Sequence, residues 1–511
     1  MRVFVFGIGG TGARVITQLV MHLAAGVRPV GEDGQILKDD FSIVPILVDP
    51  HAECEALVSL GELLNDYRTI HNRLYSGVKD PGRGFFSVKI ETMHDINSSV
   101  THDDFTFRLS NISNKSFKNY IGKDLMKPEN SLFMDFLFSN AELNTEMSEG
   151  FYGSPNIGCV ALNSFGDSAD FAAFKQCVRS NTDKVFFIGS IFGGTGASGL
   201  PLFISNIRHM LRRGMDDAEN SGKSPIGALI VMPYFKIGDD KSSPINDSDF
   251  MVKTRSALSY YESNMNHLIN NIYYIADWGD KMTNPFENDP GDRDNQKGNK
   301  AHIVEYMGAA ALFDFIKSDN RDVNDDGTVP RTQFKAYGID SDDENIGTIT
   351  FKEFGGDVKD FLRLPYMKFV IMKHYMEHHL SGDGQKPYAS NHNPKIETSI
   401  VNNAELQRIF RKFDLLIDQM HSHGSAAHNL SFYNYISGED YTSAFNNIGT
   451  KSGVLGRKKK VEKNDILKAL NKQADEQKNS LQGINTGEQR WFRIADVAIE
   501  NVIKELYDLN N

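Results

Sequence analysis

Short apolar runs alternate with longer stretches of helical spacing along the first two thirds of the chain. The runs are rich in β-branched and aromatic residues and are bounded by glycine, proline or aspartate, which is typical of buried strands. We predict strands at residues 2–6, 41–50, 185–188, 226–235 and 271–280. Helical periodicity follows at 13–25, 200–213 and 299–317. This alternation indicates an α/β fold with a parallel sheet covered on both faces.

Two other parts of the chain show a different pattern. Residues from about 61 to 149 are polar and lack a clear period, and we interpret them as a partly helical insertion. From about residue 355 onward four stretches carry helical periodicity, so the C-terminal third is predicted to be mainly helical. We therefore expect an α/β domain at 1–330 and a mainly α-helical domain at 331–511.

Composition narrows the class of protein. A chain of 511 residues with 40% hydrophobic side chains is long enough to bury a sizeable core. The net charge of −12 argues against nucleic acid as a partner, because nucleic-acid binders present a basic surface. Cys54, Cys159 and Cys177 match no zinc motif and favour a reducing compartment. With no apolar run near the length of a membrane span, we expect a cytoplasmic protein.

A glycine loop follows the first predicted strand and precedes a helix. It reads Gly7-Ile-Gly9-Gly10-Thr11-Gly12 and matches the dinucleotide fingerprint G-x-G-x-x-G. Glycines allow close approach of a phosphate, and the helix N-terminus supplies oriented N–H groups. Asp49, which ends the second predicted strand, fits the same fingerprint, although it lies farther along the chain than the usual spacing of about 20 residues.

A second glycine loop follows another predicted strand and opens another helix. It spans Gly193 to Gly199 and reads GGTGASG. A dinucleotide-binding domain needs one such loop, whereas two loops at the strand ends of one sheet can hold a triphosphate from both sides. The pair therefore favours a nucleoside triphosphate as the ligand.

The two loops resemble those of the tubulin/FtsZ superfamily, whose signature loop reads GGGTGSG. The match is GGTG at Gly193–Gly196 followed by Pro201, with Phe192 and Ser198 departing from the signature. Together with the N-terminal GIGGTG, this pattern is most similar to divergent bacterial tubulin-like proteins. The resemblance covers about residues 1–330. It implies a tubulin/FtsZ-like parallel-sheet fold that binds GTP with Mg²⁺, with ATP as the alternative nucleotide.

The resemblance also assigns roles to individual positions. Residues expected to bind the nucleotide and its magnesium are Gly9, Gly10, Thr11, Gly12, Asp49, Gly193, Gly194, Thr195, Gly196, Ala197 and Asp277. Asp277 would lie near the base, and Asp49 near magnesium and the γ-phosphate. Tyr152–Gly158 stands where the family has a further glycine-containing phosphate loop. Arg14 and Ile237 replace a guanine-contacting Asn and a ribose-contacting Glu.

An acidic segment after the helix at 299–317 is the candidate catalytic loop. Asn320, Asp322 and Asp325 reproduce the N-x-D-x-x-D spacing of the loop that, in the family, orients the attacking water from the next subunit. Carboxylates suit this role because they orient water and accept its proton. Two alternatives use the same segment. It begins like an EF-hand calcium loop, although Gln333 replaces the bidentate Glu at position 12, and it is also compatible with a plain acidic turn.

The resulting expectation is slow GTP hydrolysis coupled to head-to-tail self-assembly into filaments. One alternative is an NAD(P)-dependent oxidoreductase that uses only the first loop. Another is a scaffold in which bound nucleotide stabilises an assembly and is never turned over. The helical C-terminal region is a candidate docking element for a protein partner.

Overall fold

The computed structural model contains the whole chain, and its secondary structure is described over most of the sequence. The described residues are 1–31, 37, 40–50, 54–78, 84–109, 112, 115–147, 151, 154–179, 182–213, 224–234, 247–276, 300–319, 324, 328–336, 348–349, 354, 356–379, 403–421, 429–430, 472 and 487–506.

A seven-stranded, wholly parallel sheet forms the centre of the molecule. Its strands are β1 (Arg2–Ile8), β2 (Ser42–Val48), β3 (Lys89–Ile90), β4 (Lys184–Ser190), β5 (Ile226–Val231), β6 (Asn271–Ile275) and β7 (Gln333–Ala336). The order across the sheet is β3-β2-β1-β4-β5-β6-β7, so the chain reverses its direction of travel between β1 and β4. The predicted α/β class with a parallel sheet is confirmed.

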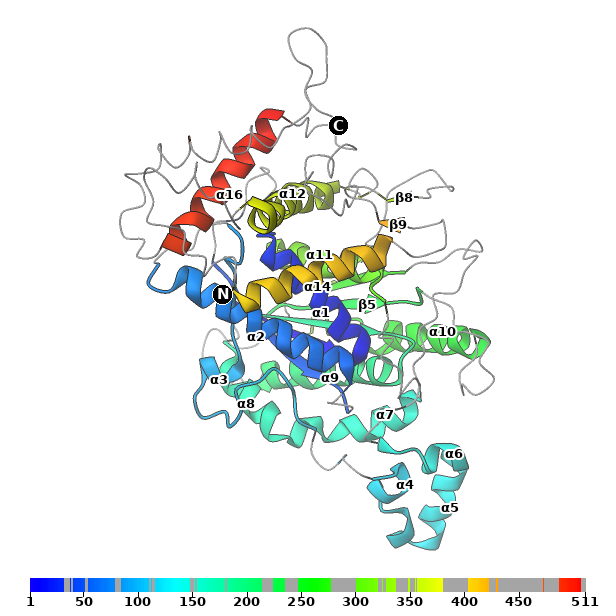
Figure 1. Cartoon of the computed structure of the whole chain (residues 1–511). Helices are drawn as coiled ribbons and strands as arrows, with labels where there is room; N and C mark the ends of the chain where they lie inside the picture. The colour runs from blue at the N-terminus through cyan, green and yellow to red at the C-terminus, as the bar shows by residue number, and fades with distance from the viewer. Residues whose placement is uncertain are drawn as a thin grey trace.

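Helices cover both faces of this sheet (Figure 1). One face carries α1 (Gly9–Ala24), α2 (Glu55–Tyr75) and α11 (Ile303–Lys317). The other carries α7 (Pro155–Leu162), η3 (Asn163–Asp167), α8 (Ala169–Cys177), α9 (Gly194–Arg213) and α10 (Asp247–Asn264). Nearly every position of α1 is buried, because this helix lies between the sheet and further helices.

The C-terminal helices form an outer layer on α1 and α2 (Figure 1). They are α12 (Gly356–His379), α14 (Ala404–His421) and α16 (Gly487–Leu506), and β8 (Thr348–Ile349) pairs separately with β9 (Asn429–Leu430). Their buried residues belong to the same continuous core as the sheet. The expected boundary at residue 330 falls just before β7, which pairs with β6. Across the described ranges, no helix is long and apolar enough to cross a membrane.

A buried ion-pair network fixes α16 to α12. The Lys368 ammonium contacts Asp496 Oδ1 at 2.7 Å and Glu500 Oε2 at 3.0 Å. Burial opposes the charge on Lys368, but the two carboxylates outweigh it and raise the Lys368 pKa. A buried ammonium that keeps its charge in this way requires its partners, so α16 has one defined position on α12.

The segment expected as an insertion is partly built into the core. Residues 61–75 belong to α2, whose apolar positions recur every three or four residues between polar ones, and β3 pairs with β2 at one edge of the sheet. The remainder holds the short helices α3 (Met93–Ile96), α4 (Phe117–Tyr120), η1 (Lys123–Leu125), α5 (Pro128–Leu137) and α6 (Asn140–Leu143). The mixed composition of α2 hid its periodicity at the sequence level.

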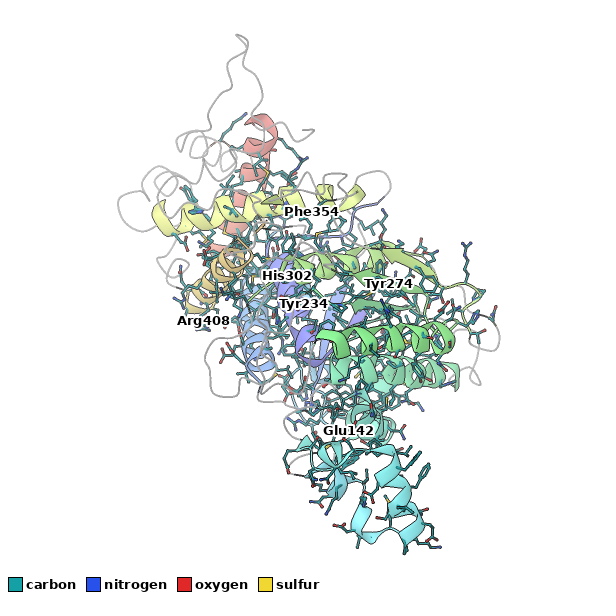
Figure 2. All side chains as sticks on the ribbon, turned by 90° about the vertical axis from the view of Figure 1, so that its right-hand side faces the viewer. Glu142, Tyr234, Tyr274, His302, Phe354 and Arg408 are labelled. Atoms are coloured by element: carbon teal, nitrogen blue, oxygen red, sulfur yellow. The ribbon has the colours of Figure 1, made fainter. Side chains whose placement is uncertain are left out.

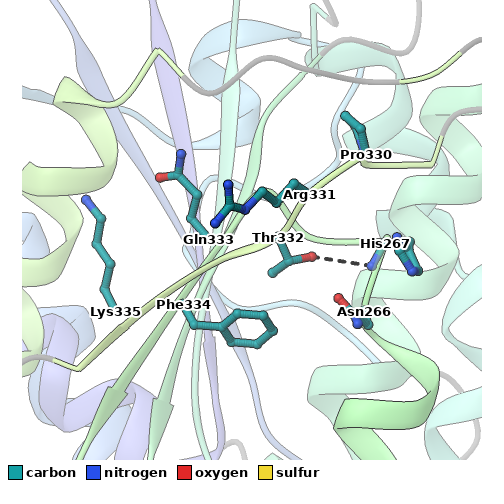
Figure 3. A pocket seen from close by; sticks show the side chains of 8 residues that line it. All are labelled: Asn266, His267, Pro330, Arg331, Thr332, Gln333, Phe334 and Lys335. Atoms are coloured by element: carbon teal, nitrogen blue, oxygen red, sulfur yellow. Dashed lines mark hydrogen bonds between the residues drawn. The ribbon is translucent and has the colours of Figure 1, made fainter.

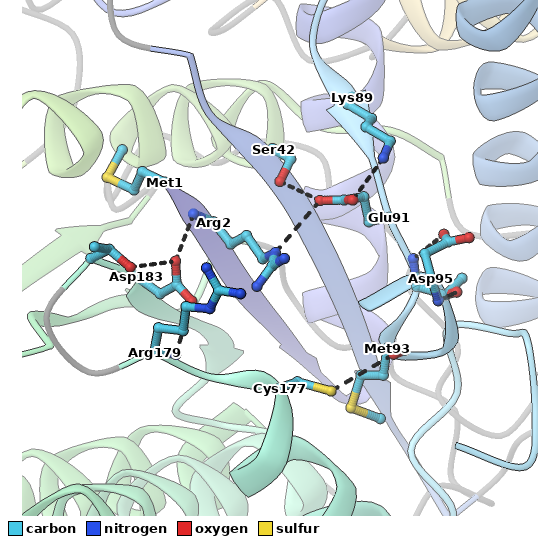
Figure 4. Close-up of polar contacts among 12 residues, drawn as sticks. Met1, Arg2, Ser42, Lys89, Glu91, Met93, Asp95, Cys177, Arg179 and Asp183 are labelled. Carbon is cyan, nitrogen blue, oxygen red and sulfur yellow. Dashed lines mark hydrogen bonds and ion pairs between the residues drawn. The ribbon is translucent and has the colours of Figure 1, made fainter. Parts of the chain in front are cut away.

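Polar contacts tie the amino ends of β1, β2 and β3 together (Figure 4). The Arg2 N–H donates to Asp183 Oδ1 at 2.9 Å, and the Ser42 hydroxyl donates to Glu91 Oε2 at 2.6 Å. Lys89 forms an ion pair with the same Glu91 at 2.8 Å. Structural contacts therefore occupy the amino ends of these strands, and the glycine loops lie at the carboxyl ends of the strands.

Stability is expected to fall in mild acid because of a buried histidine in α1. His22 is fully buried, with Nδ1 at 2.7 Å from Tyr366 Oη and Nε2 at 3.0 Å from the Tyr306 carbonyl. Burial lowers its pKa to about 4, so the unfolded chain binds a proton first as the pH falls. The free energy of unfolding should drop between about pH 6.5 and 4, by about 3 kcal/mol from this group.

Urea denaturation at several pH values from 7.5 to 4.5 measures this slope. The His22→Gln variant, which keeps a hydrogen-bonding side chain without a titrating ring, should show a smaller loss of stability over that range. An unchanged slope in the variant would show that other groups govern the acid sensitivity.

Candidate functional site

The two glycine loops lie at the point where the strand order reverses. Helix α1 begins at Gly9 directly after β1, and α9 begins at Gly194 shortly after β4, which is the neighbour of β1 in the sheet. In open α/β sheets, ligands bind outside the carboxyl ends of the strands at such a reversal. The second predicted loop is shorter than expected, because all of its residues after Gly193 belong to the first turns of α9.

Gly9 brings the two loops and Asp49 into one place. Its φ is +73°, a conformation that favours glycine. A Cβ atom on Gly9 would lie 3.5 Å from Thr195 Cβ, 3.7 Å from the Gly196 nitrogen and 3.8 Å from Asp49 Oδ2. Asp49 follows β2 directly and is half-buried. Residues more than 140 positions apart in the sequence therefore meet at the first turn of α1.

The glycines of the loops have different structural roles. A Cβ on Gly12 would lie 2.7 Å from the carbonyl carbon of Gly7, and one on Gly196 would overlap Ser190, so these two allow the helices to pack closely on the strands. A Cβ on Gly10 would meet no atom within 4 Å. Gly10 is therefore a position in the first loop that faces open space.

The first turns of α1 and α9 contain no acidic residue of their own. The N-cap of α1 is Ile8, which makes no side-chain cap. By contrast, α2, α11, α14 and α16 each begin with a Glu in the first turn. Since an anion is favourable at a helix N-terminus, the two site helices are suited to an external one.

Two hydrogen bonds from buried hydroxyl groups fix the first turn of α9. The Ser198 hydroxyl is fully buried and donates to the Gly194 carbonyl at 2.6 Å, and the Tyr261 hydroxyl on α10 donates to the Ala197 carbonyl at 3.0 Å. Gly158 of α7 packs against Ser198. The stretch expected as a further phosphate loop is thus partly helix α7, and Tyr152 lies outside the described residues.

A buried polar cluster adjoins the first loop. Glu305, in the first turn of α11, forms an ion pair with Arg14 of α1 and accepts a hydrogen bond from the Tyr234 hydroxyl at 2.7 Å. Tyr234 also hydrogen-bonds Thr11, and its ring lies 5.0 Å from that of His302. Figure 2 shows Tyr234 and His302 together at the centre of the molecule.

The charges of this cluster compensate each other. Burial opposes the charge on Arg14, but Glu305 outweighs it and raises the Arg14 pKa. Burial raises the pKa of Tyr234 well above its ordinary value, so this hydroxyl stays protonated and donates to Glu305. The Arg14 guanidinium also donates to the Lys300 carbonyl at 2.8 Å. Arg14 therefore connects α1 to α11 in this structure.

Sequence reasoning missed Tyr234, His302 and Glu305 as parts of the site. One signal was available, because His302 and Glu305 have the three-residue spacing of a capping box at the start of a predicted helix. Their partners on α1 and after β5 are distant in sequence. No local pattern connects them.

Several predicted residues cannot be placed at the site. Asp277, Asn320, Asp322 and Asp325 lie outside the described residues, as does Ile237. Of the neighbouring described residues, the Asn324 backbone N–H donates to the Thr328 carbonyl at 2.7 Å. The catalytic, calcium-binding and plain-turn interpretations of 320–326 therefore all remain predictions.

The donor groups present fit a nucleotide phosphate and its magnesium. The first turns of α1 and α9 supply backbone N–H groups beside the open space at Gly10. Asp49 supplies a carboxylate oxygen, the ligand type that Mg²⁺ prefers. Within the described part of the chain, no cluster of three His, Cys, Asp or Glu side chains is arranged to hold a metal by itself. A magnesium ion here would thus depend on phosphate oxygens as well as on Asp49.

A separate hollow of about 720 Å³ lies at the amino ends of β6 and β7 (Figure 3). Its lining residues are Asn266, His267, Pro330, Arg331, Thr332, Gln333, Phe334 and Lys335. None of the predicted site residues is among them. The hollow lies at the amino ends of the strands, whereas the glycine loops lie at the carboxyl ends. The meeting point of α1, α9 and Asp49 is therefore the candidate functional site.

Comparison with known proteins does not assign the chain to a family. No protein-family model and no curated protein matches the chain.

Proposed function

We propose that the chain binds a nucleoside triphosphate, GTP with Mg²⁺, between the N-termini of α1 and α9. The observation that carries this proposal is the close approach of Gly9 to Thr195, Gly196 and Asp49. Backbone N–H groups from two helices would hold the phosphates, Asp49 would contact the magnesium, and Gly10 would leave room for the ligand. Two electropositive helix ends at one point suit several negative charges better than one.

We further propose that hydrolysis is slow and depends on head-to-tail assembly, as the resemblance to the tubulin/FtsZ superfamily implies. Asn320, Asp322 and Asp325 of one subunit would orient the attacking water beside the phosphates held by the next. A contact between two different surfaces of the same chain, repeated without closure, produces an open filament. The role of the bound Mg²⁺ would be to neutralise charge on the phosphates.

Turnover measured over a range of protein concentrations tests this proposal. We expect GTP hydrolysis per subunit to rise steeply with concentration, together with light scattering from polymers. Asp322→Asn should abolish turnover and leave GTP binding within about twofold. If nucleotide is bound but stays intact at all concentrations, and Asp322→Asn has no effect, the scaffold alternative holds.

An NAD(P)-dependent oxidoreductase is the second candidate, and two observations favour it. The order β3-β2-β1-β4-β5-β6 is that of dinucleotide-binding folds, and Asp49 directly follows β2, where such folds bind a ribose. The two candidates differ at the second loop. Thr195→Asp should weaken triphosphate binding at least tenfold by charge repulsion, whereas a dinucleotide that uses only the first loop should bind with unchanged affinity.

A further inference from the structure

A small helical unit projects from the body of the molecule on the side opposite the C-terminal helices (Figures 1 and 2). It contains α4, η1, α5 and α6, and its two ends are joined by an antiparallel bridge between Ser116 and Glu146. Phe117 and Phe138 pack with ring centroids 4.8 Å apart in its interior, and Leu143 and Met147 are buried there. These buried residues extend the continuous core of the molecule into the unit.

Helix α5 carries an exposed apolar stripe on this unit. Leu132, Phe133, Phe136 and Leu137 are 71%, 55%, 86% and 47% exposed, and Leu125 of η1 is 93% exposed. These five are nearly half of the eleven exposed large hydrophobic residues among the described part of the chain. We call Leu125, Leu132, Phe133, Phe136 and Leu137 the α5 face.

The α5 face lies on the side of α5 that points away from the rest of the unit. Ser131 and Met134 are half-buried on the opposite side of the helix, and α5 has no fully buried residue. The spacing of residues 132, 133, 136 and 137 places all four side chains on one side of the helix, and this side faces outward. A cluster of exposed apolar side chains of this kind is typical of an interaction surface, because single exposed apolar residues are common and contiguous patches are not.

Two ion pairs lie within the unit. Lys123 contacts Asp135 at 3.0 Å, and Lys118 contacts Asp124 at 3.3 Å. The α5 face therefore presents apolar groups without a dominant charge that would select a strongly acidic or basic partner. Contacts between identical subunits are more apolar than transient contacts between different proteins.

We propose that the α5 face packs against the α5 face of a second copy of this chain across a two-fold axis. Two Phe and three Leu side chains offer on the order of 600 Å² of apolar surface, given roughly 200 Å² for an accessible aromatic side chain. With a polar rim this approaches the roughly 800 Å² per partner of a standard interface. A self-complementary patch of this type closes a two-fold dimer. The contact is independent of the proposed nucleotide site.

Sedimentation velocity of the full-length, nucleotide-free protein in EDTA tests the dimer. The wild type should be dimeric at micromolar concentration, and Phe136→Glu should weaken dimerisation at least 100-fold. Val252→Glu is the matched control, because Val252 on α10 is 63% exposed and lies outside the α5 face. A wild type that is monomeric up to 50 µM, or a Phe136→Glu variant that remains dimeric, would overturn the proposal.

Cysteine cross-linking distinguishes a two-fold contact from a head-to-tail one. Phe133→Cys, made together with Cys159→Ser to remove the exposed native thiol, places one reactive cysteine on the α5 face. A short bismaleimide should link two copies in high yield, because a two-fold axis brings identical residues together. A head-to-tail contact pairs α5 with a different surface and would give no cross-link, which would contradict the proposal.

Discussion

Gly10→Asp is expected to lower the affinity for GTP by at least 100-fold without lowering the stability of the protein. The open space at Gly10 accepts a side chain without a clash, since a Cβ there meets no atom within 4 Å. An aspartate in the first turn of α1 interacts favourably with the helix dipole, so Tm should stay the same or rise. The same carboxylate would stand where the phosphates are proposed to bind, and like charges in contact cost several kcal/mol.

This variant separates binding from folding, because the affinity for GTP should fall while the Tm stays the same or rises. Titration calorimetry with GTP and Mg²⁺ gives the affinity, and thermal unfolding without nucleotide gives the stability. Gly61→Asp is the matched control, because Gly61 lies in α2 and a Cβ there also meets nothing within 4 Å. Unchanged GTP affinity in Gly10→Asp would remove the first loop from the binding site.

Glu305→Ala is expected to destabilise the fold by about 3–5 kcal/mol, since it leaves a buried charge without its partner. The Glu305 side chain is 2% exposed and the Arg14 side chain 12% exposed, so water cannot replace the lost carboxylate. The variant also removes the acceptor of the Tyr234 hydroxyl. Because Thr11 and Arg14 both belong to the first turns of α1, nucleotide affinity should fall as well.

Urea denaturation of the nucleotide-free protein measures the change in the free energy of unfolding without any contribution from nucleotide binding. Glu305→Gln keeps the size of the side chain and one acceptor oxygen, and should cost less than the alanine variant. The double variant Arg14→Met with Glu305→Leu removes both charges and should recover much of the stability. A cost below about 1 kcal/mol for Glu305→Ala would mean that the pair is solvated and does not join α1 to α11.

The sheet was predictable because parallel strands that are buried on both faces consist of nearly continuous runs of apolar residues. β2, β5 and β6 lie within predicted stretches, whereas β1 and β4 contain the predicted stretches and extend beyond them. β3 and β7 were missed, since β3 is only two residues long and β7 has an exposed, mixed pattern. α2 was missed for a related reason, as its buried leucines are separated by polar residues that face outward.

The candidate site was predictable where a local motif carried it. Glycine loops are visible in sequence because each lies between a strand and a helix, and their convergence follows from the reversal of strand order at β1 and β4. The cluster of Arg14, Tyr234 and Glu305 was not predictable, because it joins three segments that only the tertiary fold brings together. From the sequence, Arg14 was noted only as a replacement for a guanine-contacting Asn, and the structure pairs it with Glu305.

The central claim is that the meeting point of α1, α9 and Asp49 holds a nucleoside triphosphate. The most direct measurement is chromatography of the nucleotide released when the purified full-length protein is denatured. We predict close to one guanine nucleotide per chain, and much less from Gly10→Asp purified in parallel. Release of NAD(P) would contradict the claim, as would the absence of any nucleotide together with no detectable GTP binding by calorimetry.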